Sequence, residues 1–186
     1  MTKIVGISGS LRVGSYNSML LRAAAAAAPA GTAIEIATIE GIPLYNLDVE
    51  EKGTPEAVTA LRERIIAGDG LLLVTPEYNN SIPGVLKNAI DWLSRPPDGA
   101  RVFAGLPVGL IGATVGMGAT SLAQAAWLPV LRTLQTLPWF GGRLGVSGSG
   151  TAFDAQGGLG DDKLRAQLEK YVTGFAKFVA DHPRPR

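Results

Sequence analysis

Residues 71–75 read Leu-Leu-Leu-Val-Thr, a run of four large apolar residues without a charge. A strand that is buried on both faces has such a continuous run, whereas a strand exposed on one face alternates. Apolar residues at helical spacing precede this run in 54–68 and follow it in 83–95. A buried strand between two amphipathic helices predicts a parallel sheet with helices packed on both faces.

The pattern repeats along the chain. We expect strands at 3–8, 33–39, 71–75, 107–114 and 143–147, alternating with helices at 15–28, 54–68, 83–95 and 119–134 and from Asp161-Asp162 onward. Because crossovers between parallel strands are right-handed, this alternation favours a doubly wound α/β sheet of five strands in the order 2-1-3-4-5. Thr54 is expected to cap the second helix, with Pro55 at its first position. Residues 1–182 are expected to form one domain, followed by a short Pro/Arg tail at 183–186.

The composition excludes several classes of enzyme. The 186 residues include no cysteine and a single histidine, His182, near the C-terminus. Thiol nucleophiles, thiolate metal sites and a Ser-His-Asp triad are therefore not expected, and Asp161-Asp162 is interpreted as a helix cap rather than a metal site. Glycine is in excess, at 24 residues, which suggests places where the backbone must approach something closely. Difficult chemistry would then belong to a bound cofactor.

Charge and hydropathy point to a small-molecule partner. The net charge of +1, from 17 basic and 16 acidic residues, creates no field that favours nucleic acid. No charge lies between Arg101 and Arg132, but Pro107, Pro129 and several glycines interrupt that stretch. We interpret it as a buried strand, a loop and a helix rather than a membrane span. The N-terminus lacks the features of a secretory signal, so a cytoplasmic location is expected.

The first expected strand leads into a loop that suits a phosphate. Residues 9–18 read Gly-Ser-Leu-Arg-Val-Gly-Ser-Tyr-Asn-Ser. Backbone amides at a helix start attract an anion, hydroxyls add donors, and Arg12 adds a charge-assisted contact. A nucleotide P-loop would need Lys-Ser or Lys-Thr after Gly14, and the G-x-G-x-x-G spacing of dinucleotide folds is absent. A monophosphate cradle is favoured, with an ordinary serine-rich turn as the alternative.

Two more loops are expected at the same sheet edge. Residues 75–84 read Thr-Pro-Glu-Tyr-Asn-Asn-Ser-Ile-Pro-Gly, which combines rigid backbone, an aromatic ring and amide groups suited to a flat heteroaromatic ligand. The alternatives are a surface tyrosine for Tyr78 and a helix cap or buried acid for Glu77. Residues 112–121 contain glycines that permit close backbone approach or a tight strand–helix turn. In doubly wound sheets, ligands bind outside the carboxyl ends of the strands, at the switch between the first and third strands.

The motifs together resemble the NAD(P)H-dependent FMN reductases, a flavodoxin-like family that includes quinone, chromate and azo reductases. The resemblance rests on 9–17, on Pro-Glu-Tyr-Asn at 76–79, on Lys-Asn-Ala-Ile-Asp-Trp at 87–92 and on Ile-Pro-Leu-Tyr-Asn at 42–46, and it extends over nearly the whole chain. The third loop departs from the family pattern because it reads Gly-Met-Gly-Ala at 116–119 instead of a fuller glycine run.

The resemblance implies an FMN cofactor, with NADPH or NADH as co-substrate and no catalytic side chain or metal. The residues implied to bind FMN are Ser10, Arg12, Ser15, Asn17, Ser18, Pro76, Glu77, Tyr78, Asn79 and Gly116. Hydride would pass from NAD(P)H to FMN, and electrons would then pass to a small-molecule acceptor: a quinone, a flavin, an azo compound or a metal oxyanion such as chromate. Family members form dimers or tetramers, so a homodimer or homotetramer is expected, with the loop of Tyr45 and the helix of Trp92 as candidate contacts.

The same fold supports two other functions. A flavodoxin-type electron carrier without nicotinamide activity is the main alternative, although such carriers are strongly acidic and this chain is nearly neutral. A phosphorylated receiver domain would need acids after the first strand and an aspartate after the third. Those positions hold Ser8-Gly9-Ser10 and Thr75-Pro76-Glu77, which disfavour it.

Overall fold

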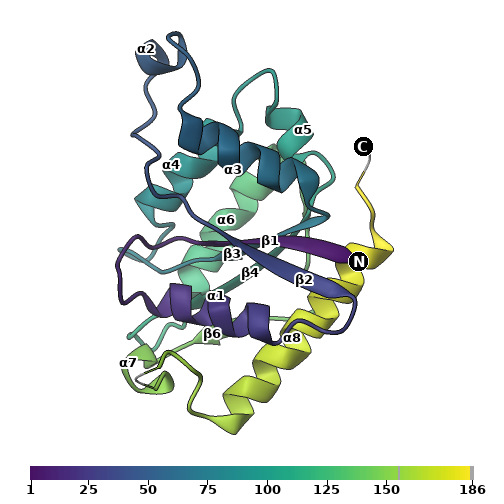
Figure 1. The fold of residues 1–186 in the computed structure, drawn as a ribbon. Coiled ribbons are helices and arrows are strands. Elements are labelled where there is room, and N and C mark those ends of the chain that lie inside the picture. The colour runs from purple at the N-terminus through teal and green to yellow at the C-terminus, as the bar shows by residue number, and fades with distance from the viewer. Residues whose placement is uncertain (155, 185–186) are drawn as a thin grey trace.

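The computed structural model describes residues 1–154 and 156–184 and shows one twisted parallel sheet between two layers of helices (Figure 1). Its four long strands are β1 (Thr2–Ser8), β2 (Thr32–Ala37), β3 (Gly70–Val74) and β4 (Pro107–Ala113). They are hydrogen-bonded in the order β2-β1-β3-β4, and every pairing is parallel. Part of the predicted tail, residues 185 and 186, lies outside the described residues.

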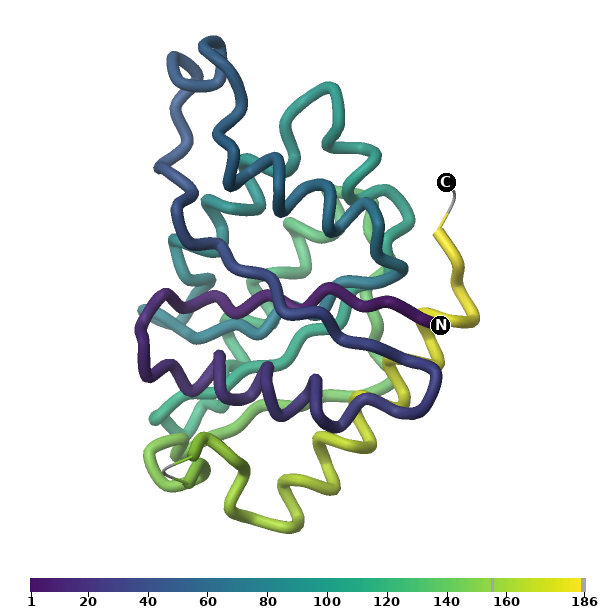
Figure 2. The backbone as a smooth tube through the Cα atoms, in the orientation of Figure 1, coloured from purple at the N-terminus to yellow at the C-terminus, as the bar shows by residue number. Residues whose placement is uncertain are grey.

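Helices pack on both faces because side chains of one strand alternate between them. On one face, Leu71 and Leu73 pack with α3 (Glu56–Ala67), α4 (Gly84–Leu93), α5 (Gly99–Phe103) and α6 (Ser121–Thr133). On the other face, Leu72 and Val74 pack with α1 (Tyr16–Ala26) and α8 (Asp162–Asp181). The tube in Figure 2 shows the same two layers, with the C-terminal helix crossing below the sheet. The predicted α/β sheet with order 2-1-3-4-5 is confirmed.

The fifth position of the sheet differs from the single strand predicted at 143–147. It holds two short strands, β5 (Leu137–Pro138) and β6 (Leu144–Val146), which both pair with β4. Between them, Trp139 still donates its amide to the Val108 carbonyl of β4 at 2.8 Å, and its indole packs edge-on against Tyr171 of α8, with ring centroids 4.8 Å apart. A Cβ at Gly142 would lie 2.8 Å from the Trp139 ring. The chain therefore detours around this indole and rejoins the edge further along.

Helix ends follow the expectations in part. Asp161 caps α8 as expected, since its side chain accepts a 2.9 Å hydrogen bond from the amide of Lys163. The prediction for Thr54 is wrong: Pro55 is the capping residue of α3, and no side chain caps that end. Three short helices were not predicted, because each has five residues or fewer and no amphipathic pattern to reveal it: α2 (Leu47–Glu50), α5 (Gly99–Phe103) and α7 (Ser149–Ala152).

Within the described ranges, no helix is long and apolar enough to cross a bilayer. The same part of the chain contains no group of three or more side chains of histidine, aspartate or glutamate that could hold a metal ion.

Candidate functional site

The three predicted loops meet at the carboxyl edge of the sheet around a cavity of about 420 Å³. The first loop contributes Ser10, Arg12, Ser15, Tyr16 and Asn17; the second contributes Pro76, Glu77 and Tyr78; the third contributes Ala113, Thr114 and Val115. A larger cavity, of about 770 Å³, lies between α8 and residues 139–145. We place the site in the smaller one because doubly wound sheets bind ligands between the first and third strands.

The first loop begins with Gly9, where close packing against neighbouring side chains leaves no room for a Cβ. A Cβ at Gly9 would lie 2.8 Å from Leu86 and 2.9 Å from Pro76, so a side chain would force the first and second loops apart. Ser15 then caps α1, because its hydroxyl accepts a 3.3 Å hydrogen bond from the amide of Ser18. The first turn of α1 contains no acidic residue, which leaves the helix start attractive to an anion.

Arg12 is the cation of this loop. Its guanidinium lies 5.0 Å from the ring centroid of Tyr16, and no carboxylate pairs with it among the described residues. Ser10 supports the turn, since its hydroxyl accepts a 3.4 Å hydrogen bond from the amide of Arg12. Tyr16 was missed as a site residue, although its position four residues after Arg12 suits a stacking contact. Hydroxyls, a helix start and an uncompensated cation together fit a phosphate group.

Asn17 is buried and its amide has a structural partner. Its Nδ2 donates to the carbonyl of Ala113, and its Oδ1 accepts from the amide of the same residue, both at 2.9 Å. Asn17 thus joins the first loop to the end of β4. Ser18 lies further back: its hydroxyl donates to that of Ser8 at 3.0 Å, and it lines a neighbouring cavity of about 220 Å³ instead of the three-loop cavity.

The second loop is a tight turn that presents an aromatic ring. Tyr78 and Ser81 exchange two backbone hydrogen bonds, of 3.2 and 3.0 Å, around Asn79 and Asn80. Both asparagines have left-handed backbones, with φ of 50° and 59°, a conformation that asparagine tolerates better than most residues. Asn79 therefore occupies the exposed corner of the turn and does not line the cavity, whereas Tyr78 does.

The third loop supplies residues that the sequence interpretation did not single out. Thr114 and Val115 line the cavity, while Gly116 lies just beyond it and donates its amide to the Thr114 hydroxyl at 3.3 Å. The position of Thr114 and Val115 directly after β4 is the sequence feature that could have identified them as site residues. Gly112, next to the last residue of β4, lies so close to the second loop that a Cβ there would overlap the Thr75 carbonyl and the Thr120 hydroxyl.

The carboxylate of Glu77 binds backbone amides of the chain itself. Its Oε2 accepts hydrogen bonds from the amides of Leu122 at 2.9 Å and Ala123 at 3.0 Å, at the start of α6. The helix-cap alternative for Glu77 is therefore confirmed, although it caps a helix distant in sequence.

The two segments suggested for a subunit contact bind each other within the chain. Asn88 of α4 accepts from the amide of Tyr45 at 2.8 Å and donates to the carbonyl of Pro43 at 2.8 Å, and Trp92 donates to that carbonyl at 2.9 Å. The indole of Trp92 is completely buried. The contact between Ile-Pro-Leu-Tyr-Asn and Lys-Asn-Ala-Ile-Asp-Trp is thus intramolecular.

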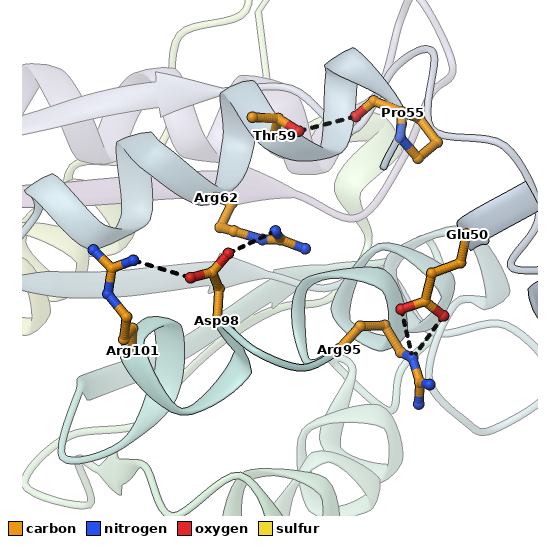
Figure 3. Close-up of polar contacts among 7 residues, drawn as sticks. All are labelled: Glu50, Pro55, Thr59, Arg62, Arg95, Asp98 and Arg101. Atoms are coloured by element: carbon orange, nitrogen blue, oxygen red, sulfur yellow. Dashed lines mark hydrogen bonds and ion pairs between the residues drawn. The ribbon is translucent and has the colours of Figure 1, made fainter. Parts of the chain in front are cut away.

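Ion pairs reinforce the attachment of this segment (Figure 3). Glu50 accepts from Nε of Arg95 at 2.9 Å and from the Tyr45 hydroxyl at 2.7 Å. The hydrogen bond from Tyr45, with help from Arg95, lowers the pKa of Glu50. The same hydrogen bond, together with burial, raises the pKa of Tyr45 against the opposing effect of the Arg95 charge. Nearby, Asp98 pairs with Arg62 at 3.0 Å and with Arg101 at 2.9 Å. The Glu50 contacts hold the segment 43–50 against the end of α4, whereas the Asp98 pairs join α3 to the start of α5.

The residues at the cavity fit FMN. The first loop offers the anion site that the FMN phosphate needs. The second and third loops line the same cavity with an aromatic ring, backbone and small side chains, which suit a flat ring system. Seven of the ten residues implied to bind FMN line this cavity; Ser18, Asn79 and Gly116 do not.

Comparison with known proteins agrees with this fit. A family model described as NADPH-dependent FMN reductase matches residues 2–150. The chain is 48% identical over 177 residues to an NAD(P)H-dependent FMN reductase of Pseudomonas aeruginosa, covering 95% of each protein. It is 37% identical over 179 residues to a 2-hydroxy-1,4-benzoquinone reductase of a Burkholderia species, covering 96% of this chain and 97% of the relative.

A solved structure resembles the whole fold. A flavoenzyme NAD(P)H:(acceptor) oxidoreductase from Paracoccus denitrificans superposes with a TM-score of 0.89 and 32% identity, covering 99% of this chain and 100% of the other. The match of the family model over most of the chain, and identities above 30% along its length, show that the chain belongs to the NADPH-dependent FMN reductase family.

Proposed function

We propose that this protein oxidises NAD(P)H and reduces a quinone with the help of FMN bound across the three loops. The observation that carries the proposal is the convergence of an anion site, an aromatic turn and a small-residue loop on one cavity. Bound FMN would supply the redox chemistry, taking two electrons as hydride from the nicotinamide and giving them to the quinone, which becomes a hydroquinone by also taking up one proton from solvent. No proton-transferring side chain is needed for hydride transfer, consistent with a site without histidine.

The chain's own residues bind and orient. Arg12, the hydroxyls of Ser10 and Ser15 and the start of α1 would hold the phosphate. Pro76, Tyr78, Thr114 and Val115 would hold the ring system and exclude water from it.

The rim of the site favours an uncharged, flat acceptor. The first loop exposes Leu11 and Val13, and the third loop exposes Val115 and Met117. These apolar side chains suit a quinone, and the relatives named quinone reductases support this choice. Azo compounds and metal oxyanions such as chromate are further proposed acceptors, and we expect chromate, as an anion among apolar side chains, to be the poorer one.

The experiment is a steady-state assay on the full chain loaded with FMN. We expect NADPH or NADH oxidation that depends on 1,4-benzoquinone. Double-reciprocal plots of rate against one substrate, at several fixed concentrations of the other, should give parallel lines, as a ping-pong mechanism requires. A protein that binds FMN but oxidises neither nucleotide would instead be an electron carrier. A protein that binds no FMN would contradict the proposal altogether.

We also propose that the protein is a homodimer or homotetramer. The segment 43–50 exposes Leu44 and Leu47, at 82% and 51% of their maximal area, and a second copy would cover them. Light scattering coupled to size-exclusion chromatography tests this, with Leu44→Glu as the variant expected to shift the population toward monomer.

A further inference from the structure

Helix α6 begins beside the cavity without a cap of its own. Its N-cap residue, Thr120, has a left-handed backbone with φ of 58°, and its side chain makes no capping hydrogen bond. The Thr120 hydroxyl instead accepts from Nε2 of Gln124 at 3.0 Å. The first turn contains no acidic residue. The free amides and the positive end of the helix dipole must therefore be satisfied from elsewhere.

Glu77 satisfies them from the second loop. One carboxylate oxygen, Oε2, receives the amides of both Leu122 and Ala123, 45 and 46 residues further along the chain. Glu77 lies between Pro76 and Tyr78, which face the cavity. Thr114 and Val115, which also line the cavity, belong to the loop that leads into α6. The Glu77 carboxylate thus joins two of the three loops that line the cavity.

We propose that Glu77 is a positioning residue for the flavin site: it clamps the second loop to the start of α6 and so sets the width of the cavity. This inference rests on the proposed function. The carboxylate is not a ligand or a proton acceptor in this role. It also fills the start of α6 with an acceptor oxygen of the chain itself, which leaves the start of α1 to the phosphate.

Three substitutions separate a clamp from a charge. Glu77→Gln keeps the reach and one acceptor oxygen but loses the charge; Glu77→Asp keeps the charge but is one methylene too short to reach the helix start; Glu77→Ala loses both. A clamp predicts that Gln stays close to wild type and that Asp resembles Ala. A general base or a purely electrostatic group predicts the opposite order. Glu56→Ala is the matched control, because Glu56 is an exposed acid in the first turn of another helix, α3.

The first measurement is amide hydrogen exchange of the flavin-free protein. We expect Glu77→Ala and Glu77→Asp to exchange at Leu122 and Ala123 about tenfold faster than wild type, as loss of a charged hydrogen bond implies. Glu77→Gln should remain within about threefold of wild type, and Glu56→Ala should be unchanged at these amides. Unchanged exchange in Glu77→Ala would overturn the clamp.

The second measurement is FMN binding, followed by quenching of flavin fluorescence and by the shape of the visible absorption band. Glu77→Ala and Glu77→Asp should bind FMN about tenfold more weakly, with an altered band, and Glu77→Gln should restore both. Weaker binding without faster exchange would make Glu77 a direct ligand and overturn the proposal; faster exchange with wild-type affinity would also overturn it. Failure of the proposed function is distinct, because it appears in the wild-type protein as absence of FMN binding. If Glu77→Ala does not fold, the order of Gln and Asp decides.

Discussion

The amide side chain of Asn17 holds both backbone groups of Ala113. Nδ2 donates to the Ala113 carbonyl and Oδ1 accepts from its amide, each at 2.9 Å, across 96 residues of sequence. Asn17 lies in the first turn of α1, and Ala113 is the last residue of β4. The pair therefore fixes the anion site relative to the third loop before any ligand is present.

Removing this amide should destabilise the protein without FMN. In Asn17→Ala, two backbone groups of a buried strand end lose their partners, which should cost about 1–3 kcal/mol of unfolding free energy. Urea denaturation of the flavin-free protein measures it. Asn17→Asp keeps the acceptor but not the donor. The loss of unfolding free energy in this variant, compared with that in Asn17→Ala, should show which of the two hydrogen bonds contributes more. Wild-type stability in Asn17→Ala would mean that these groups find water instead.

Arg12 should contribute to FMN affinity through charge. Arg12→Ala loses one charge-assisted contact with the phosphate, and we expect a loss of about 1.5–3 kcal/mol, which is roughly tenfold or more in Kd. Isothermal titration with FMN and with riboflavin measures it, because riboflavin lacks the phosphate and should bind both proteins equally. Arg22→Ala is the control, because Arg22 is an arginine of α1, the helix that follows the loop, and does not line this cavity. Equal loss of riboflavin binding would place Arg12 at the ring instead.

Local patterns predict where the loops lie but not what each side chain does there. The apolar runs and their spacing predict the strand order, and parallel strands necessarily bring their carboxyl ends to one edge. Asn17 and Glu77 stand in the expected loops, yet their partners are backbone atoms 96 and 45 residues away, which no spacing reveals. The broken fifth strand has a similar cause, because residues 141 and 142 pass close to the Trp139 indole, which packs against Tyr171 of the distant helix α8.

Acid should weaken the attachment of the segment 43–50. The pKa of Glu50 lies below its ordinary value of 4.5, chiefly because Tyr45 donates to its carboxylate. A group whose pKa is lowered by folding stabilises the protein above its unfolded pKa, and this stabilisation is lost as pH falls through the folded pKa. The stability difference between wild type and Glu50→Gln should thus be present at pH 7 and shrink below about pH 4.5. Urea denaturation at several pH values measures it, and a difference independent of pH would contradict the ion pair as its source.

Gly112 should tolerate no side chain without a loss of stability. A Cβ there would overlap the backbone carbonyl of Thr75 and the hydroxyl of Thr120, so Gly112→Ala must push β4 away from the second loop or displace the start of α6. We expect a loss of about 1–3 kcal/mol in unfolding free energy, the usual cost of overpacking, and weaker FMN binding because both walls of the cavity move. Gly84→Ala is the control, since a Cβ at Gly84 meets nothing within 4 Å and alanine is favoured in a helix. Urea denaturation and FMN titration of both variants test the difference, and a Gly112→Ala protein that matches Gly84→Ala in both would show that the two loops separate at no cost.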